Sequence, residues 1–447
     1  MSPHALRRDR HGRGPSVSRR SLLAEAGGAI ALAVLGDRRS AGADWTVPSA
    51  NINVTFWDSS SAPKAKLYNE LILPGYKRQR PNYTVKYENI ATGNLLQKLL
   101  AATATGTAPE IFELGDWVFP TYFGRGLLDP LPAEAFGFKS LQELLDSYLP
   151  GSLAAMQHEG KLYGLPDFLA SHSLHVNNRL FREAGLDPVK DAPKTWNEVA
   201  RLNKILTKRK GDQVVQKGFE FRYVDERSMS LTFHHLLYQA GGEALDKEGR
   251  PAFNSDAGVN AMEVWKSVTV APKVSRNTGA SPFQDFGAEQ DAMSYIGPNG
   301  QAQSANINPR MKDNITVVPL PQINPAKPAT MAFSFVIVVN ANVPVDRKKV
   351  AWDFVAYALS DPRPWLANGA LLPQRAWATS AEARKLLPFY EVFMHDIAIS
   401  RPLARTPHFA ELQGALARMV ERVVLNNADP KQALDQAASE FERAAKG

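Results

Sequence analysis

Apolar and polar residues alternate along the first third of the chain with two different periods. Ile52, Val54 and Phe56 stand at every second position, the period of a strand with one buried face. The apolar residues that follow recur with the period of an amphipathic helix, which Pro81 stops. Strands are predicted over residues 51–57, 83–89 and 110–114, and helices over residues 64–79 and 95–104.

Strands that alternate with helices at this spacing predict a parallel sheet with crossover helices. In such sheets ligands gather at the carboxyl ends of the strands. Here those ends are residues 57–61, Trp-Asp-Ser-Ser-Ser, and residues 113–117, Glu-Leu-Gly-Asp-Trp. Both segments are therefore candidate binding segments.

The rest of the chain continues this pattern. Leu174 and Val176 predict a strand that leads into an amphipathic turn over residues 179–186. Thr195 and Glu198 form a T-x-x-E capping box, which starts a helix because each side chain satisfies a backbone N–H. Further strands are predicted over 218–223, 290–297, 315–319 and 332–340, a turn over 246–249, and helices over 229–239, 254–265, 346–359, 382–386, 409–425 and 430–445.

Three short segments between Lys161 and Leu206 carry a family resemblance. They are Tyr163-Gly-Leu-Pro, Leu180-Phe-Arg-Glu-Ala-Gly-Leu-Asp-Pro and Thr195-Trp-Asn-Glu. In these segments the chain resembles the family 1 extracellular solute-binding proteins of ABC importers, relatives of maltose-binding protein. The resemblance continues more weakly over nearly the whole chain after residue 50. His175 and Val176 stand where the family pattern has tyrosines.

The resemblance implies an α/β fold of the periplasmic-binding-protein-like type (class II), with two interleaved lobes joined by a hinge around a central ligand cleft. It places the crossings between the lobes near residues 168–173, 295–300 and 331–335. The N-lobe would then be residues 44–170 plus 297–332, and the C-lobe residues 171–296 plus 333–447. Spacing alone predicts the alternating strands and helices, not this interleaving.

Composition narrows the function classes. With 447 residues, 44% of them hydrophobic, the chain is long enough to bury two ordinary cores. It has no cysteine, which excludes disulfides, thiol catalysis, thiolate metal sites and a lipobox. Residues 1–43 hold eight arginines and three acidic residues, so the remainder, with 44 basic and 42 acidic residues, is nearly neutral. No nucleic-acid partner is expected.

The first 43 residues have the layout of a targeting segment. The pair Arg19-Arg20 is followed by an apolar run over residues 26–36 and by Ala41-Gly42-Ala43. This layout predicts a signal peptide of the twin-arginine type, residues 1–43, with cleavage before Asp44. The apolar run is too short to anchor the chain in a bilayer. We expect an exported, soluble, periplasmic protein without a lipid anchor.

The candidate ligand contacts combine flat rings with fixed polar groups, the combination that sugar recognition requires. Trp57 and Asp58 end one strand, and Asp116 aligns with the family's ligand-binding acid, with Trp117 after it. Glu113 falls where maltose-binding protein has an aromatic residue. The other candidates from the resemblance and from loop positions are Tyr295, Asn299, Arg375, Trp377 and Arg405, with Arg222 and Tyr223 on the opposite lobe. Asn299 stands where a maltose-type site offers a tryptophan.

No cofactor or metal is expected. Adjacent histidines on a helix diverge, as His234 and His235 would, and His172 and His175 would point to opposite faces of a strand. Glycine-rich phosphate loops and the G-x-S-x-G elbow are absent from the sequence.

The residues and the resemblance together predict a monomeric, non-enzymatic receptor. It would close two lobes on a sugar or small oligosaccharide and deliver it to the ABC permease. A glycerol-phosphate-type or polyamine ligand stays open, as does a signalling sensor in place of an importer. The rival from another class is a secreted carbohydrate hydrolase with Glu113 and Asp116 as its carboxylate pair. Two residues so close on one strand end would reach the required separation of ~5 to ~9.5 Å only by accident.

Overall fold

The computed structural model describes residues 45–446, apart from residues 60, 91, 222–224 and 271–281. The predicted signal peptide, residues 1–43, lies outside the described residues. Within the described part, no helix combines the length and apolar character that a membrane span requires. The strands form two main sheets of six and three strands.

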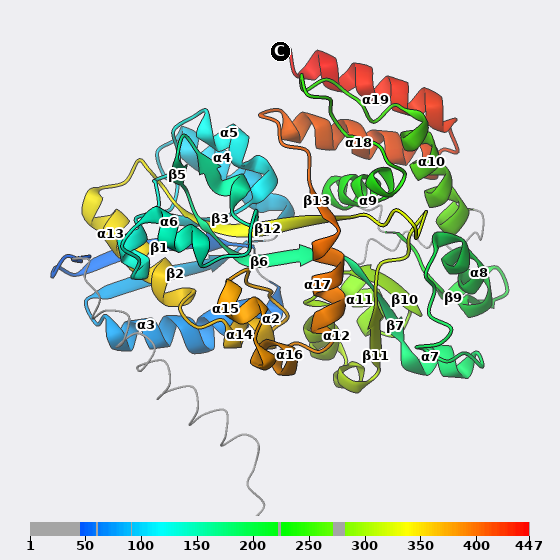
Figure 1. The fold of residues 1–447 in the computed structure, drawn as a ribbon, viewed down its shortest axis with the longest axis horizontal. Helices are drawn as coiled ribbons and strands as arrows, with labels where there is room; N and C mark the ends of the chain where they lie inside the picture. Colours follow the sequence, from blue (N-terminus) through cyan, green and yellow to red (C-terminus); the bar gives the residue numbers. More distant parts are fainter. Residues whose placement is uncertain (1–44, 60, 91, 222–224, 271–281, 447) are drawn as a thin grey trace, which may run out of the picture. The chain divides into compact units, whose positions relative to one another are not determined.

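The six-stranded sheet is organised around one long strand, β12, which pairs on both of its edges (Figure 1). β1 pairs in parallel with β2 and β3, as the alternating pattern predicts. β12 pairs antiparallel with β3 and β6 and in parallel with β13. The six strands are β1 (Ile52–Asp58), β2 (Tyr83–Asn89), β3 (Ile111–Gly115), β6 (Leu165–Ser171), β12 (Thr330–Val339) and β13 (Ser400–Pro402).

One face of this sheet is covered by helices from distant parts of the sequence. α2 (Ala62–Leu67), a π-helical turn over Tyr68–Ile72 and α3 (Leu73–Gln79) follow one another without a break, which confirms the helix predicted over 64–79. The ring of Phe56 on β1 lies 5.3 Å from that of Tyr68 and 6.0 Å from that of Phe354 on α13 (Val345–Ala358). Burial of these large rings holds both helices on the sheet.

The three-stranded sheet has the order β10-β7-β11, with both pairs antiparallel. Its strands are β7 (Ser173–Asn177), β10 (Met293–Ile296) and β11 (Ile315–Val318). The core beside it is aromatic: the ring of Phe221 lies 4.9 Å from that of Trp196 and 5.2 Å from that of Trp265. The helices that share this core are α8 (Trp196–Leu206), α9 (Glu226–Gln239), α10 (Asp256–Trp265), α18 (Phe409–Val424) and α19 (Pro430–Ala444).

The remaining elements are small hairpins and further helices. Two small hairpins join β4 (Gln157–His158) to β5 (Lys161–Leu162) and β8 (Lys208–Lys210) to β9 (Gln213–Gln216). The other helices are α4 (Thr92–Ala104), α5 (Phe119–Phe123), α6 (Leu141–Asp146), α7 (Asn178–Glu183), α11 (Pro282–Gly287), α12 (Gly300–Ile307), α14 (Arg363–Ala367), α15 (Arg375–Ala378), α16 (Ala381–Leu386) and α17 (Tyr390–Ala398).

One predicted strand is wrong. The described part of residues 218–223 joins no strand, and only Lys217 forms an isolated bridge, to Asp291. The side chain of Asn203 on α8 takes the place of a strand partner: its Oδ1 accepts from the Phe219 N–H (2.7 Å), and its Nδ2 donates to the Phe219 carbonyl (2.9 Å). Because these groups are already paired, a neighbouring strand cannot use them.

Sheet membership differs from the predicted lobes at β11, at most of β12 and at β13, which was predicted for the C-lobe but pairs with β12 in the six-stranded sheet. The chain passes from β6 in one sheet to β7 in the other at His172, inside the predicted crossing. β11, predicted for the N-lobe, pairs with β7, whereas residues 333–339 of β12, predicted for the C-lobe, lie in the six-stranded sheet. The change of sheet falls in the segment 319–329, which contains four prolines and so lacks four backbone donors. The lobes themselves remain a prediction, since pairing does not tell which parts move together.

The predicted capping box at the start of α8 is present. The Thr195 Oγ1 accepts from the Glu198 N–H (3.3 Å), and the Glu198 carboxylate accepts from the Thr195 N–H (3.0 Å). Ser255 stands at the same position of α10, but its side chain makes no capping hydrogen bond.

Thr195→Ala should lower the free energy of unfolding by about 1 kcal/mol, because it leaves a helical N–H without its partner. Urea unfolding followed by circular dichroism measures the change. Ser255→Ala is the matched control, with an expected change within about 0.5 kcal/mol. Equal losses for the two variants would contradict the role of the capping box.

Candidate functional site

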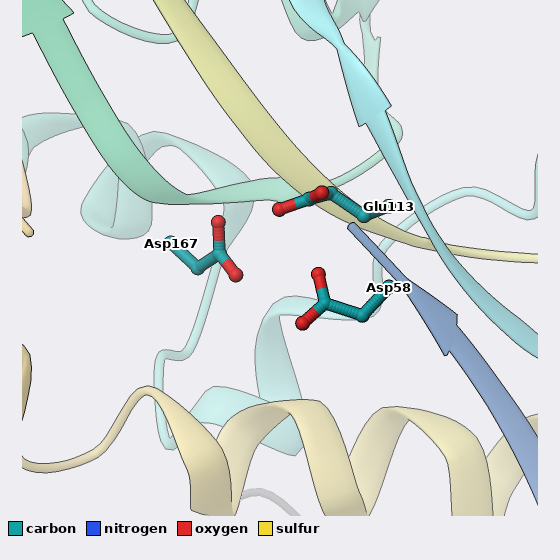
Figure 2. Close-up of side chains that lie close together, drawn as sticks. All are labelled: Asp58, Glu113 and Asp167. Atoms are coloured by element: carbon teal, nitrogen blue, oxygen red, sulfur yellow. The ribbon is translucent and has the colours of Figure 1, made fainter. Parts of the chain in front are cut away.

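Three buried carboxylates converge at the end of β1 (Figure 2). Asp58 is the last residue of β1, Glu113 lies on β3 and Asp167 on β6. The ammonium of Lys64, on the first turn of α2, stands among them. Its Nζ lies 3.0 Å from the Asp58 Oδ1 and 2.7 Å from the Asp167 Oδ2, and it also pairs with Glu113. We call these four residues the Lys64 cluster.

Further hydrogen bonds engage the oxygens of the Lys64 cluster. The Tyr87 hydroxyl donates to the Asp58 Oδ2 (3.1 Å). The backbone N–H and hydroxyl of Ser59 both donate to the Glu113 Oε2, at 3.1 and 2.7 Å. The Tyr68 hydroxyl lies 3.4 Å from the Asp167 Oδ2. The strands β1, β2, β3 and β6 and the helix α2 are therefore joined through a single desolvated group of charges.

Burial sets the protonation of this cluster. It raises the pKa of Asp58 well above its usual range, with the Glu113 charge adding to the effect, and it raises the pKa of Asp167 to about 7. Although burial by itself lowers the pKa of Lys64, the carboxylates of Asp167, Asp58 and Glu113 raise it well above its usual range. One oxygen from each of the three acids lies close enough together to hold a metal ion, and the ammonium of Lys64 supplies a positive charge there instead.

A second group of side chains forms a continuous row of rings. The ring of Trp117 lies 6.2 Å from that of Phe409 and 5.8 Å from that of Phe333 on β12. The row continues from Phe333 to His172 (5.7 Å) and from His172 to Tyr295 on β10 (4.3 Å). Phe168 and Phe335 flank it through contacts with Phe333. We call this set the ring row; it passes through both sheets at the point where the chain crosses between them.

Asp116 adds a carboxyl group beside Trp117 at the start of the ring row. It opens the 3-10 turn over Asp116–Val118, directly after β3. Burial raises its pKa to about 7, although the Arg405 guanidinium and the backbone N–H groups of Ser334 and Trp117 act in the opposite direction. Arg405 itself is exposed, and the Arg227 guanidinium lies 5.8 Å from the centre of the Phe335 ring. The arrangement can present flat apolar faces, one acid and cationic groups to a ligand.

Comparison with known proteins identifies the chain. Residues 58–362 match the model of the family described as bacterial extracellular solute-binding proteins. The chain belongs to this family. The match begins at Asp58, in the Lys64 cluster, and includes Asp116, Trp117 and most of the ring row.

Some relatives of this solute-binding protein are named for different solutes. A probable amino-acid ABC transporter periplasmic-binding protein of Sinorhizobium fredii is 30% identical over 53% of this chain and 55% of its own length. The arabinooligosaccharide-binding protein of Bacillus subtilis is 23% identical over 67% of this chain and 71% of its own length. The chain spans about half the length of the first curated relatives that it matches.

Solved structures agree on the fold. An ABC transporter solute-binding protein from Thermotoga lettingae, bound to α-D-tagatose, superposes with a TM-score of 0.77 at 20% identity, covering 88% of this chain and 99% of that one. This likeness confirms the predicted periplasmic-binding-protein-like α/β fold.

The structure brings some of the predicted site residues of this solute-binding protein together and separates others. Asp58 and Glu113 meet in the Lys64 cluster, whereas Asp116, Trp117 and Tyr295 lie in or beside the ring row. Trp57 is separated from its neighbour Asp58, because adjacent strand residues face opposite sides. Its ring lies 3.8 Å below the ammonium of Lys98 on α4.

The remaining candidates are placed elsewhere or not described. Asn299 precedes α12, and its backbone packs closely against Gly369. Arg375 is exposed on α15, with its guanidinium 3.4 Å from the Tyr148 carbonyl, and Trp377 packs at the edge of a hydrophobic cluster with Phe393. Arg222 and Tyr223 lie outside the described residues.

The sequence pattern does not indicate several members of both groups. It predicts Lys64 only as the start of a helix, although the acid Asp167 inside the apolar run Leu-Pro-Asp-Phe-Leu-Ala signals a buried partner. It predicts Phe333 and Phe335 only as strand residues. For His172 it raises only a metal site, which the spacing disfavours.

Lys64→Met should lower the free energy of unfolding by about 3–5 kcal/mol, because it leaves buried carboxylates without their cation. Because Lys64 lowers the pKa of Asp58 and Asp167, its removal raises both pKa values further, so the loss should be larger at pH 8 than at pH 5, where the acids can take up protons. Urea unfolding at both pH values measures it. Lys66→Met on the same helix removes only an exposed pair with Glu70 and should change stability by less than about 0.5 kcal/mol. Similar effects of the two variants would contradict the proposed role of Lys64.

Asp116→Asn should gain stability relative to the unchanged protein as pH rises. Because the folded-state pKa of Asp116 is raised to about 7, the folded protein holds a proton that the unfolded chain releases near pH 4. The stabilisation from this retained proton is present below pH 4 and is lost as pH rises to 7. At about 1.4 kcal/mol per pKa unit, the loss amounts to a few kcal/mol. Unfolding between pH 4 and 8 measures the difference.

A matched acid provides the control for Asp116. Lys431 and Asn254 lower the pKa of Asp435, so Asp435→Asn should keep a constant offset from the unchanged protein above pH 5. A pH-independent offset for Asp116→Asn as well would contradict the burial argument.

Proposed function

We propose that this protein is an exported receptor that binds a sugar or small oligosaccharide between two lobes and delivers it unchanged to an ABC permease. The observation that carries the proposal is the ring row with Asp116 at one end, located where the chain passes between its two sheets. Family membership gives the class of protein, and the ring row supports a sugar as the class of solute.

The chemistry of the ring row suits a carbohydrate. Pyranose rings have apolar faces that pack against aromatic rings, and their hydroxyl groups need fixed acceptors and donors. Trp117, Phe333 and Tyr295 supply the rings, and the Asp116 carboxyl accepts hydrogen bonds. The names of relatives support the same solute class, since they include an arabinooligosaccharide-binding protein and a structure with bound tagatose.

Other solutes of the same family are weaker candidates. The relative named for amino acids favours a zwitterion, which the oppositely charged Asp116 and Arg405 would suit. A glycerol-phosphate-type ligand needs more cations than Arg405 and Arg227, and a polyamine needs more acids than Asp116 near the rings. Each of these solutes belongs in the same binding screen.

Glu113 and Asp116 support a carbohydrate hydrolase less well than a receptor. Both Glu113 oxygens are engaged, one by Lys64 and the other by Ser59, and the side chain is buried. A general acid or base must instead reach the substrate oxygen directly or through one water molecule. Glu113 and Asp116 therefore make a poor catalytic pair, and we propose that the solute leaves unchanged.

Export, hinge closure and association complete the proposal. Residues 1–43 would direct export by the twin-arginine route and be removed, so the receptor would act in the periplasm as a monomer. The solute would drive closure only if it binds the closed form better than the open form, by a few kcal/mol.

A thermal-shift screen of sugars, polyols, amino acids, phosphodiesters and polyamines tests the function. A ligand at 100 times its Kd should raise the free energy of unfolding by about 2.7 kcal/mol, and we expect the largest shifts from sugars. At pH 8, where the Asp116 carboxyl is ionised, Asp116→Ala should weaken the best hit at least tenfold by calorimetry, because a hydrogen bond to a charged group contributes about 1.5–3 kcal/mol. Asp146→Ala, on the exposed side of α6, is the control and should bind normally.

Two outcomes would overturn the proposal. Conversion of the solute to a product during calorimetry would support the hydrolase. Shifts produced only by amino acids, phosphates or polyamines would replace the sugar with that solute class.

A further inference from the structure

Two histidines from distant parts of the chain are joined in the ring row. His172 stands at the junction of β6 and β7, and His235 lies on α9. The Nδ1 of His172 lies 3.4 Å from the Nε2 of His235. Ring contacts surround the pair, with Tyr295 of β10 4.3 Å from His172 and 5.2 Å from His235.

A backbone N–H determines which nitrogens carry protons. The Met331 N–H donates to the Nδ1 of His235 (3.2 Å), and a peptide N–H can only donate. The Nδ1 of His235 is therefore unprotonated, and a neutral imidazole must then hold its proton on Nε2. That proton is donated to the Nδ1 of His172, which leaves the single proton of His172 on its Nε2.

This chain of hydrogen bonds exists only while both histidines are neutral. A second proton on either ring would place two N–H groups against each other or against the Met331 N–H. The charged and titratable groups facing the pair are Arg227 and His234 on α9, His175 on β7 and Tyr295 on β10. Burial, with Arg227 and His175, lowers the pKa of His172 to about 3, and burial, with His172 and His234, lowers that of His235 well below its usual range.

The geometry also directs the remaining proton. In an imidazole ring the Nε2 points away from the Nδ1, so the Nε2–H of His172 points away from His235. His172 is half-buried, whereas His235 is fully buried. His172 also belongs to the ring row, next to Phe333. A donor of fixed direction therefore stands among the rings that the proposed function assigns to the solute.

We propose that His172 is a specificity-determining residue that donates a hydrogen bond from its Nε2–H to an oxygen of the solute, and that His235 is a positioning residue that holds this tautomer. This inference rests on the proposed function for the identity of the ligand, but the tautomer itself does not. The His235 bond to Met331 also joins the donor to the start of β12.

The first experiment needs no ligand. Histidine ¹H–¹⁵N correlation spectra of the purified protein should show His172 and His235 both as Nε2–H tautomers, with neither ring titrating between pH 5 and 8. His235→Phe should leave His172 as a mixture of tautomers, whereas His158→Gln, an exposed control, should leave it unchanged. An Nδ1–H tautomer of His172, or titration of either ring in that range, would overturn the inference whatever the solute is.

The second experiment uses the best ligand from the thermal-shift screen. His172→Phe keeps a flat ring but has no donor, and should weaken binding 10- to 100-fold. His172→Gln places an amide N–H near the Nε2 position and should bind within threefold of the unchanged protein. Equal affinities for the Phe and Gln variants would refute the donor role while leaving the receptor function standing. A screen without any hit would instead contradict the proposed function, and the spectra would still decide the tautomer.

Discussion

The pairing of β12 on both of its edges is the constraint on which the rest of this structure depends. Residues 335–339 pair with β3, and residues 332–337 pair with β6 on the other edge. Because side chains alternate along a strand, this register sends Met331, Phe333 and Phe335 toward one side. A shift of one residue would turn both rings away from Trp117 and would break the Met331 bond to His235.

The buried acids of the two groups of functional side chains have different partners. In the Lys64 cluster, one ammonium faces three acids, and the hydroxyl groups of Ser59 and Tyr87 engage further carboxylate oxygens, although burial still raises the pKa of Asp58 and Asp167. The groups that oppose burial at Asp116 are the exposed Arg405 guanidinium and nearby backbone N–H groups, and burial raises the pKa of Asp116 to about 7. A carboxyl of this kind is suited to a partner from outside, whereas the Lys64 cluster holds α2 on its strands.

Much of the fold follows from local patterns, and the failures follow from long-range contacts. The strands over 52–58 and 83–89 and the capped helix after Thr195 were predictable, because alternation and the T-x-x-E spacing act between near neighbours. The strand expected at 218–223 fails because Asn203, sixteen residues before Phe219, pairs with the Phe219 backbone groups. The sequence pattern predicts Asp116 and Trp117 at a strand end, but not Phe333 and Phe409, which contact the Trp117 ring.

Residue patterns and the family resemblance are enough to predict the class of protein, the alternation of strands and helices, and the candidate acids after β1 and β3. Which of those acids are engaged within the protein depends on long-range contacts of the folded chain. The tertiary structure brought Lys64 to Asp58 and Glu113, added Asp167 from β6, and joined His172 to His235 across 63 positions of sequence. The physical reason is that periodicity and capping depend on residues within a few positions. The pKa of a buried group and the tautomer of a histidine depend on whatever the fold places beside them.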